Sequence, residues 1–252
     1  EQGYNIIFGT TFGYLDAMAE MAEEYPDVIF LHCSGYLKND TNFGNYFGKM
    51  YQPRYLSGLA AGAMTESNKI GYVAAFPIPE VIRGINAFAT GVKEVNPDAT
   101  VEVVWTFTWF GPEAETQAAN ALLETGVDVL AQHQDSPSTG IAAEAAGAKW
   151  ISYNTAYGQD AAPGAFVTAP VWDWGPYYVE IVESIINDEF VAEAYWGGME
   201  TGLVSLYELT SDVPTETASL ISDRTEEIIS GSYDPPIVEE EFIDNVIGTV
   251  NP

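Results

Sequence analysis

The chain alternates short apolar runs with longer segments in which apolar positions recur every three to four residues. The apolar runs predict strands at 5–9, 27–33, 42–47, 69–75, 101–107, 127–132, 149–153 and 165–169. The periodic segments predict helices at 13–25, 53–64, 79–96, 112–125, 136–147, 175–187 and 215–230. Repeated alternation of strand and helix indicates an α/β fold with mostly parallel sheets and helices on both faces.

The loops that follow the predicted strands are the first places to look for a site, because open parallel sheets bind ligands beyond the carboxyl ends of their strands. These loops carry the rings of Phe12, Phe76, Trp109, Tyr157, Trp172 and Trp174. Aromatic walls suit a flat ligand, and offset stacking contributes about 0.5–1.5 kcal/mol per pair beyond area burial. Any one of these rings could instead close the end of a hydrophobic core, but the set favours a binding site.

Polar side chains occur in the same loops. They are Gln132, His133, Asp135, Ser136, Asn154 and Asp173. Carboxylate and amide groups supply the acceptors and donors that read the edge of a heterocycle. Apolar walls with a few placed polar groups are typical of a small-molecule pocket.

Composition narrows the classes of partner. The 252 residues hold 37 acidic and 8 basic side chains, for a net charge of −29, and 47% of them are apolar. A core for one large domain or two lobes is therefore available. The charge opposes contact with nucleic acid, which needs clustered Lys and Arg, and it is typical of a halophilic protein whose self-repulsion is screened by salt.

Catalytic and metal-binding patterns are weak. The single cysteine, Cys33, lies in an apolar run and is interpreted as a structural thiol. The two histidines, His32 and His133, lie on different predicted strands, and HExxH, GxSxG and phosphate-binding glycine loops are absent from the sequence. No cofactor and no metal are expected, and the pair His133 and Asp135 is the one candidate for acid–base chemistry.

Several segments carry a family resemblance. They read FGTTFGY at 8–14, PRYLSGLAAGAMT at 53–65, KIGYVAAFPIPEVIRGINAFATGVKEVNP at 69–97, WFGPEAE at 109–115, GVDVLAQHQDS at 126–136 and DWGPYY at 173–178. Together, and not singly, they resemble the basic membrane protein family, the substrate-binding lipoproteins of ABC importers related to the purine nucleoside receptor. The similarity runs from about Gly3 to Leu206.

The resemblance implies a fold and a domain division. The implied fold is the type I periplasmic-binding-protein architecture, two Rossmann-like lobes joined by a hinge. The implied division is 1–67 and 173–200 for the first lobe, 68–172 and 201–232 for the second, and 233–252 for a C-terminal tail. Family members carry a strand, a helix and a further strand before FGTTFGY, so the N-terminal part of the first lobe is expected to be missing from this chain.

The resemblance also implies a receptor and not an enzyme. Such a receptor captures a small molecule in the cleft between its lobes and passes it to the permease of an ABC importer. It works outside the cytoplasm and is held to the membrane only through a lipid anchor upstream of this chain. The expected ligand-binding residues are Phe12, Phe76, Trp109, Asp135, Ser136, Asn154, Trp172, Asp173 and Trp174.

Two departures from the family pattern bear on the ligand. Nucleoside-binding members have Asp at the position of Asn154 and Lys near Trp172, and that pair holds the ribose hydroxyls. Because Asn and Trp remove both charges, we expect a purine nucleobase, adenine-like, in place of a nucleoside. The alternatives are a receptor for a purine nucleoside or another flat heterocycle, the ligand-sensing domain of a regulator, and an enzyme that acts on purines.

Overall fold

The computed structural model describes residues 3–249 and consists of two compact units. The first unit contains the chain up to Lys49 together with Asp173–Leu203. The second contains Met50–Trp172 and the chain from Val204 onward. The chain therefore passes from one unit to the other three times, and each unit is described by itself below.

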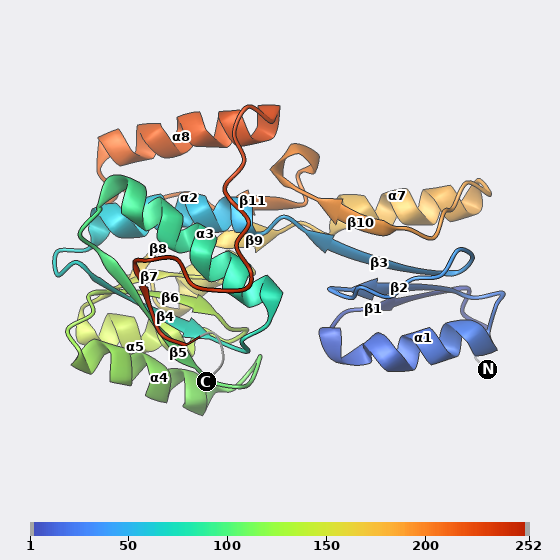
Figure 1. The fold of residues 1–252 in the computed structure, drawn as a ribbon, viewed down its shortest axis with the longest axis horizontal. Coiled ribbons are helices and arrows are strands. Elements are labelled where there is room, and N and C mark those ends of the chain that lie inside the picture. Colours follow the sequence, from blue (N-terminus) through green and yellow to red (C-terminus); the bar gives the residue numbers. More distant parts are fainter. Residues whose placement is uncertain (1–2, 250–252) are drawn as a thin grey trace. The chain divides into compact units, whose positions relative to one another are not determined.

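The first unit is built on four parallel strands in the order β1-β2-β3-β10. The strands are β1 (Ile6–Gly9), β2 (Ile29–Cys33), β3 (Phe43–Gly48) and β10 (Ala194–Gly197). The helices are the 3-10 turn η1 (Phe12–Tyr14), α1 (Leu15–Glu24), α7 (Gly175–Ile186) and the 3-10 turn η2 (Met199–Thr201). Helix α1 covers one face of the sheet and α7 the other (Figure 1). Met18, Ala22, Phe30 and Phe43 form the core under α1.

The second unit is built on six parallel strands in the order β12-β5-β4-β6-β7-β8. They are β4 (Lys69–Ala74), β5 (Thr100–Trp105), β6 (Val129–His133), β7 (Lys149–Ile151), β8 (Phe166–Thr168) and β12 (Val246–Ile247). A separate antiparallel pair joins β9 (Pro170–Trp172) to β11 (Val204–Leu206).

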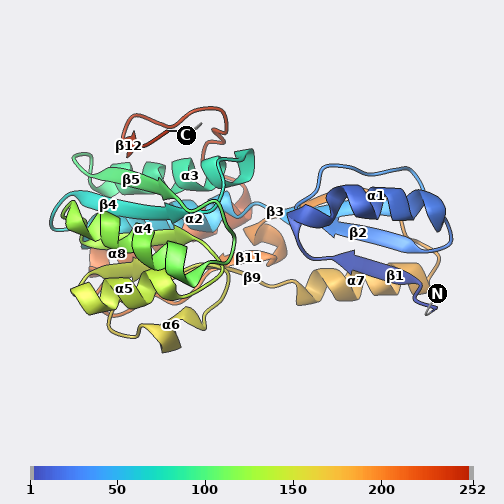
Figure 2. The same ribbon diagram turned by 90° about the horizontal axis from the view of Figure 1, so that it is seen from below.

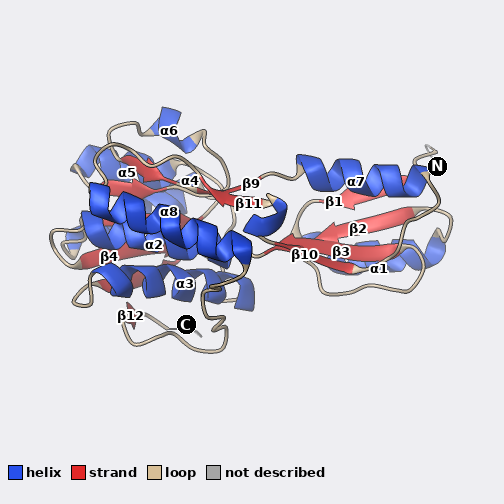
Figure 3. Cartoon of the chain, turned by 90° about the horizontal axis from the view of Figure 1, so that it is seen from above, coloured by secondary structure: helices blue, strands red, loops and turns tan. Residues whose placement is uncertain are grey.

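Helices cover both faces of this larger sheet. They are α2 (Tyr51–Met64), α3 (Pro79–Val95), α4 (Pro112–Glu124), α5 (Ser138–Ala146), the short α6 (Gly158–Ala161) and α8 (Thr215–Ser230). Helices α4 and α5 lie on one face (Figure 2). Helices α2 and α3 lie on the other, and α8 packs on the outer side of α2 (Figure 3). The fold is thus a mixed α/β fold with parallel sheets, as the sequence pattern predicts.

Close packing of α2 on α3 assigns residues 50–67 to the second unit, whereas the sequence analysis placed them in the first lobe. A Cβ atom at Gly58 would lie 2.0 Å from the carbonyl oxygen of Phe88, and one at Gly91 would lie 2.1 Å from that of Tyr55. Only glycine permits helix backbones to approach so closely. The small residues of α2 therefore fit against α3 and the sheet of the second unit.

The C-terminal segment also belongs to the second unit, although the sequence analysis treated 233–252 as a separate tail. Strand β12 pairs with β5, and the Lys93 ammonium lies 2.5 Å from the Asp244 carboxylate. Arg83 forms an ion pair with Glu239, and the Asn86 amide donates to the Val238 carbonyl at 2.9 Å. The segment is thus held by strand β5 and by three residues of α3. Among the described residues, no helix combines the length and the apolar character needed to cross a membrane.

Candidate functional site

Four of the predicted site residues form one connected set at the carboxyl edge of the six-stranded sheet. The Asp135 backbone N–H donates to the Trp109 carbonyl at 2.9 Å. The Asn154 side-chain amide donates to Asp135 Oδ1 at 2.6 Å, and the Trp172 backbone N–H donates to the Asn154 carbonyl at 3.4 Å. The loops after β5, β6 and β7 and the strand β9 are thereby tied together.

Asn154 has a left-handed backbone conformation, which asparagine adopts more readily than most residues. Its φ is +70°, in the left-handed region, and it makes an isolated parallel bridge to Val171. Asn and Asp tolerate this region better than other non-glycine residues because their short polar side chains bond locally. The backbone thus turns sharply after β7 and presents the Asn154 amide to Asp135.

The predicted aromatic residues of the second unit pack on neighbouring rings and do not line the pocket that holds Asp135 and Asn154. The ring centroids of Phe76 and Trp109 are 5.4 Å apart, and those of Trp109 and His133 are 6.1 Å apart. Phe76, Trp109 and Trp172 are each half-buried, so part of every ring remains open. Trp172 also makes a side-chain hydrogen bond with Tyr153, for which its indole N–H is the donor.

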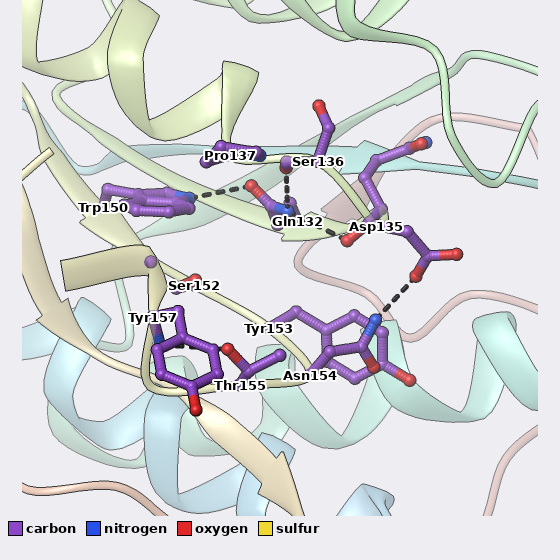
Figure 4. Close-up of a pocket in the computed structure, with 12 residues that line it drawn as sticks. Gln132, Asp135, Ser136, Pro137, Trp150, Ser152, Tyr153, Asn154, Thr155 and Tyr157 are labelled. Atoms are coloured by element: carbon purple, nitrogen blue, oxygen red, sulfur yellow. Dashed lines mark hydrogen bonds between the residues drawn. The ribbon is translucent and has the colours of Figure 1, made fainter. Parts of the chain in front are cut away.

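A pocket of about 270 Å³ opens at this edge (Figure 4). It is lined by Gln132, Gln134, Asp135, Ser136, Pro137, Trp150, Ser152, Tyr153, Asn154, Thr155, Tyr157 and Gly158. Figure 4 shows the Trp150 indole donating to the Gln132 amide oxygen, at 3.0 Å. The Gln132 amide nitrogen in turn donates to the carbonyls of Gln134 and Ser136, so the loop that carries Asp135 is fixed from below.

The polar pair retains unused hydrogen-bonding capacity. Within residues 3–249, no protein group bonds to Asp135 Oδ2 or to Asn154 Oδ1. Asp135 is open to solvent, yet the surrounding protein raises its pKa, and the hydrogen bond from Asn154 opposes that rise. A ligand that reaches the pair would meet two acceptors and the second N–H of the Asn154 amide.

Ser136 lines the same pocket, but its hydroxyl is engaged by the protein. It donates to Glu115 Oε2 at 2.6 Å, and only 3% of the residue is exposed. Burial raises the pKa of Glu115, and the hydrogen bond from Ser136 opposes the rise. The structure therefore shows Ser136 bracing the loop next to Asp135, and its contact with a ligand stays a prediction.

The other three predicted residues, Phe12, Asp173 and Trp174, lie in the first unit. The Trp174 ring stacks on Tyr178 at a centroid distance of 6.3 Å and meets Tyr46 edge to face at 5.3 Å. Asp173 accepts from the Gly175 backbone N–H at 3.1 Å. It also borders a pocket of about 190 Å³ lined by Asp173, Pro176, Tyr177, Glu180, Tyr195, Thr201 and Leu203. Phe12 is half-buried at the start of η1.

A charged residue behind the site was missed by the sequence analysis, which counted basic residues only in the loops. Arg54 of α2 is fully buried, and its Nη1 donates to the Gln132 carbonyl at 2.7 Å. Its guanidinium carbon lies 3.9 Å from the centre of the Tyr153 ring. The available signal was one arginine inside a helix otherwise rich in small and apolar residues, which indicates a buried partner for that charge.

Two titratable groups adjoin Arg54. His133 Nε2 lies 3.7 Å from Glu80 Oε1. Burial raises the pKa of Glu80 to about 7, and Arg83 and Arg54 oppose the rise. Burial, reinforced by Arg54 and Arg83, lowers the pKa of His133 well below its usual value, so the imidazole is neutral near pH 7. Among residues 3–249, no three His, Cys, Asp or Glu side chains are grouped to hold a metal ion.

Comparison with known proteins places the chain in a family. A family model described as ABC transporter substrate-binding protein PnrA-like, of the Bmp family, matches residues 1–236. A protein of Haloferax volcanii, named provisionally as an ABC transporter glucose-binding protein, is 46% identical over 230 residues, which cover 91% of this chain and 58% of that protein. A purine-binding protein of Brucella abortus is 37% identical over 238 residues, which cover 92% of this chain and 66% of that protein.

The chain thus spans less than two thirds of the length of each of these relatives. The fold is shared with an ABC transporter solute-binding protein of Aeropyrum pernix, at a TM-score of 0.79 and 16% identity, over 92% of this chain and 78% of that one. The family resemblance of the six sequence segments is therefore confirmed, and the chain belongs to the Bmp family of PnrA-like ABC transporter substrate-binding proteins.

Proposed function

We propose that this chain is the ligand-binding part of an extracytoplasmic receptor that delivers a purine nucleobase, adenine-like, to the permease of an ABC importer. The family model and the purine-binding relative from Brucella abortus support the receptor and the ligand class. The receptor holds its ligand without converting it. A lipid anchor upstream of this chain is part of the proposal.

The observation that carries the proposal is the connected set Trp109, Asp135, Asn154 and Trp172. Adenine presents an amino donor beside a ring-nitrogen acceptor, and an Asn side chain matches that edge with its oxygen and its N–H. Here Asn154 Oδ1, its second N–H and Asp135 Oδ2 have no protein partner among the described residues. The backbone of Trp109 bonds to Asp135, and its indole, which packs next to Phe76, is the flat surface that we expect the ring to use.

The same set favours a bare base over a nucleoside. A ribose needs groups that bond to its hydroxyls, and a site that lacks them discriminates against the sugar. The indole N–H of Trp172 is already engaged with Tyr153, so Trp172 presents mainly apolar surface. Asn154 uses one of its two N–H groups on Asp135, which leaves the pair suited to one edge of a ring.

A sugar is the second candidate, because the relative from Haloferax volcanii is named provisionally as glucose-binding. An aromatic face and a carboxylate–amide pair also fit a pyranose, whose C–H face packs on a ring while its hydroxyls bond to polar groups. The two candidates differ in how many hydrogen-bond acceptors the site must supply. A base needs one acceptor for its amino group, which Asp135 can be, whereas a sugar needs several acceptors for its hydroxyls.

Isothermal titration of the chain with adenine, adenosine and glucose separates these ligands. We expect adenine to bind at least about tenfold more tightly than either of the others, which corresponds to about 1.4 kcal/mol. Tighter binding of adenosine would contradict the argument from Asn154 and Trp172. Tighter binding of glucose would replace the base by the sugar, and recovery of altered adenine after incubation would contradict a receptor without turnover.

A further inference from the structure

Phe107 has a backbone conformation that is unusual for its residue type. Its φ is +55°, in the left-handed region, where the Cβ atom of an L residue crowds the following carbonyl oxygen. Among residues 3–249, the other positive φ values outside glycine belong to Ser34, Asn68, Asn154 and Asp188. Three of these are Asn or Asp, whose short polar side chains tolerate this region, whereas a bulky side chain there is an outlier.

Packing of the Phe107 side chain does little to offset this strain. The residue is 55% exposed, and its ring meets that of Phe76 edge to face at a centroid distance of 6.4 Å. Hydrophobic stabilisation scales with the apolar area removed from water, so a ring that is half open contributes little of it. Phe107 therefore strains the backbone without a matching gain in burial, and strain of this kind occurs mainly where a functional site requires it.

Neighbouring hydrogen bonds hold the Phe107 backbone in this conformation. The Phe107 N–H donates to the Ala75 carbonyl at 2.9 Å. The Thr106 hydroxyl donates to the Thr108 carbonyl at 3.1 Å and accepts from the Gln134 side-chain amide at 2.6 Å. Bonds from the residues on both sides of Phe107 thus fix the turn, which is the condition under which a strained backbone persists in a folded protein.

The strained turn lies at the carboxyl edge of the six-stranded sheet. Phe107 follows the end of β5 by two residues, and open parallel sheets bind their ligands at this edge. Gln134, which bonds to Thr106, lines the pocket that also holds Asp135 and Asn154. Phe107 is therefore attached to the pocket wall through Thr106, while its ring remains open to an incoming molecule.

We propose that Phe107 is a ligand-binding residue of the receptor and that its ring packs on the apolar face of the bound molecule. The inference rests on the proposed function, because it needs a ligand with such a face at this edge of the sheet. Contact with the ligand would bury the area that the fold leaves exposed. A phenyl ring stacks without any hydrogen bond, so Phe107 favours a flat base over a molecule covered with hydroxyl groups.

Isothermal titration of variants at position 107, with adenine, adenosine and glucose as ligands, tests the proposal. Phe107→Ala and Phe107→Gly both remove the ring, and we expect each to weaken binding of the tightest of the three ligands by about 5- to 150-fold. Phe107→Tyr keeps a ring and should bind within about twofold of the unmodified chain. Tyr25→Ala removes an exposed aromatic side chain that precedes β2 and should leave the affinity unchanged.

The same variants separate the ring from the backbone strain. Glycine adopts a positive φ readily and alanine does not. The midpoint of thermal unfolding, Tm, should therefore be about 2–4 °C higher for Phe107→Gly than for Phe107→Ala. The ligand affinity should be equal in the two variants, because neither carries a ring. Equal Tm values would show that the turn is not strained and would remove the argument for a functional role.

The outcomes distinguish this inference from the proposed function. Unchanged affinity in Phe107→Ala and Phe107→Gly, while the unmodified chain binds one of the three ligands, would exclude Phe107 from the site and leave the receptor proposal in place. An affinity that falls only in the less stable variant would show that Phe107 acts through the fold and not through contact. An unmodified chain that binds none of the three ligands would overturn the proposed function and this inference together.

Discussion

The two units of the chain surround their aromatic residues with different neighbours. In the first unit, Trp174 packs against Tyr46 and Tyr178. In the second unit, the Trp109 loop bonds to Asp135, which is bonded to Asn154. Both tryptophan rings thus pack on other aromatic rings, Trp174 on Tyr46 and Tyr178 and Trp109 on Phe76. The difference is that the backbone of Trp109 is also bonded to the loop that carries the polar pair.

The units also differ in how firmly their helices are packed. Helices α2 and α3 of the second unit are largely buried and touch through glycines. Helix α7 of the first unit buries Tyr177 and exposes Val179, Val182 and Ile186. The polar pocket therefore rests on the better packed of the two frameworks, which is where a site of fixed geometry is expected.

The largest effect is expected from Gly91→Ala in the second unit. Its Cβ would lie 2.1 Å from the Tyr55 carbonyl oxygen, so the two helices must separate, at a cost of about 3 kcal/mol or more of unfolding free energy. Gly13→Ala in the first unit meets no atom within 4 Å and is the matched control. Denaturant unfolding of both variants measures the difference. Equal stabilities would show that the α2–α3 contact is not the rigid part of the structure.

The second effect is a pH dependence that originates at Glu80. Its pKa of about 7 in the folded chain exceeds the usual 4.5, so the folded state binds this proton more tightly. The stability that the protonated carboxyl contributes is complete below about pH 4.5 and is lost as the pH rises through 7. The shift corresponds to about 3 kcal/mol at most. Glu80→Gln stays neutral and should become more stable relative to the unmodified chain over this range.

Unfolding free energies of the two proteins, measured at intervals from pH 4.5 to 8, test this sign. Asp98, which is exposed and precedes strand β5, provides the control variant Asp98→Asn. Curves for Glu80→Gln and the unmodified chain that run parallel would show that Glu80 titrates normally and that the surroundings of Arg54 are more open than described.

The third prediction compares the two tryptophans directly. Trp174→Ala removes ring contacts with Tyr46 and Tyr178 and should lower the unfolding free energy by about 2–3 kcal/mol. Trp109→Ala should weaken adenine binding by about 5- to 150-fold, since stacking of a base on an aromatic side chain contributes about 1–3 kcal/mol. Calorimetry and denaturant unfolding of both variants are needed. Normal adenine binding by Trp109→Ala would show that the base does not stack on the Trp109 indole.

The smallest effect is expected from Asp135→Asn. The substitution replaces a charged acceptor by a neutral amide, and we expect adenine affinity to fall about tenfold, in line with hydrogen bonds to charged groups. Asp98→Asn lies at the opposite, amino edge of the sheet and should leave the affinity unchanged. If both variants bound equally well, the polar pair would have no part in recognition.

The sequence predicted the regular elements of both sheets but not their short or irregular additions. Strands β4 to β7 and the helices between them follow from apolar runs and from helix stops such as Gly126 and Gly147, both at positive φ. The strands β9, β10 and β11 were missed because segments of three or four residues are too short to carry a clear period. Helix α6 has four residues and strand β12 has two, so they too are short for a periodic pattern.

The placement of the candidate site residues was predictable where they lie in loops that directly follow strands. Trp109, Asp135 and Asn154 each follow a parallel strand, so chain order alone brings them to one edge. Arg54 was not predictable in this way, because it reaches Gln132 from a helix whose assignment to the second unit depends on contacts with α3. Tertiary packing, and not local pattern, decides the partner of a buried charge.

The central claim is that the carboxyl edge of the six-stranded sheet reads the edge of a purine base. A crystal structure of the chain with adenine tests it most directly. We predict electron density for the ring against the Trp109 indole, with hydrogen bonds to Asp135 and Asn154 and with Trp172 nearby. Density for adenine at another place, with no contact between the ligand and Asn154 or Asp135, would contradict the account.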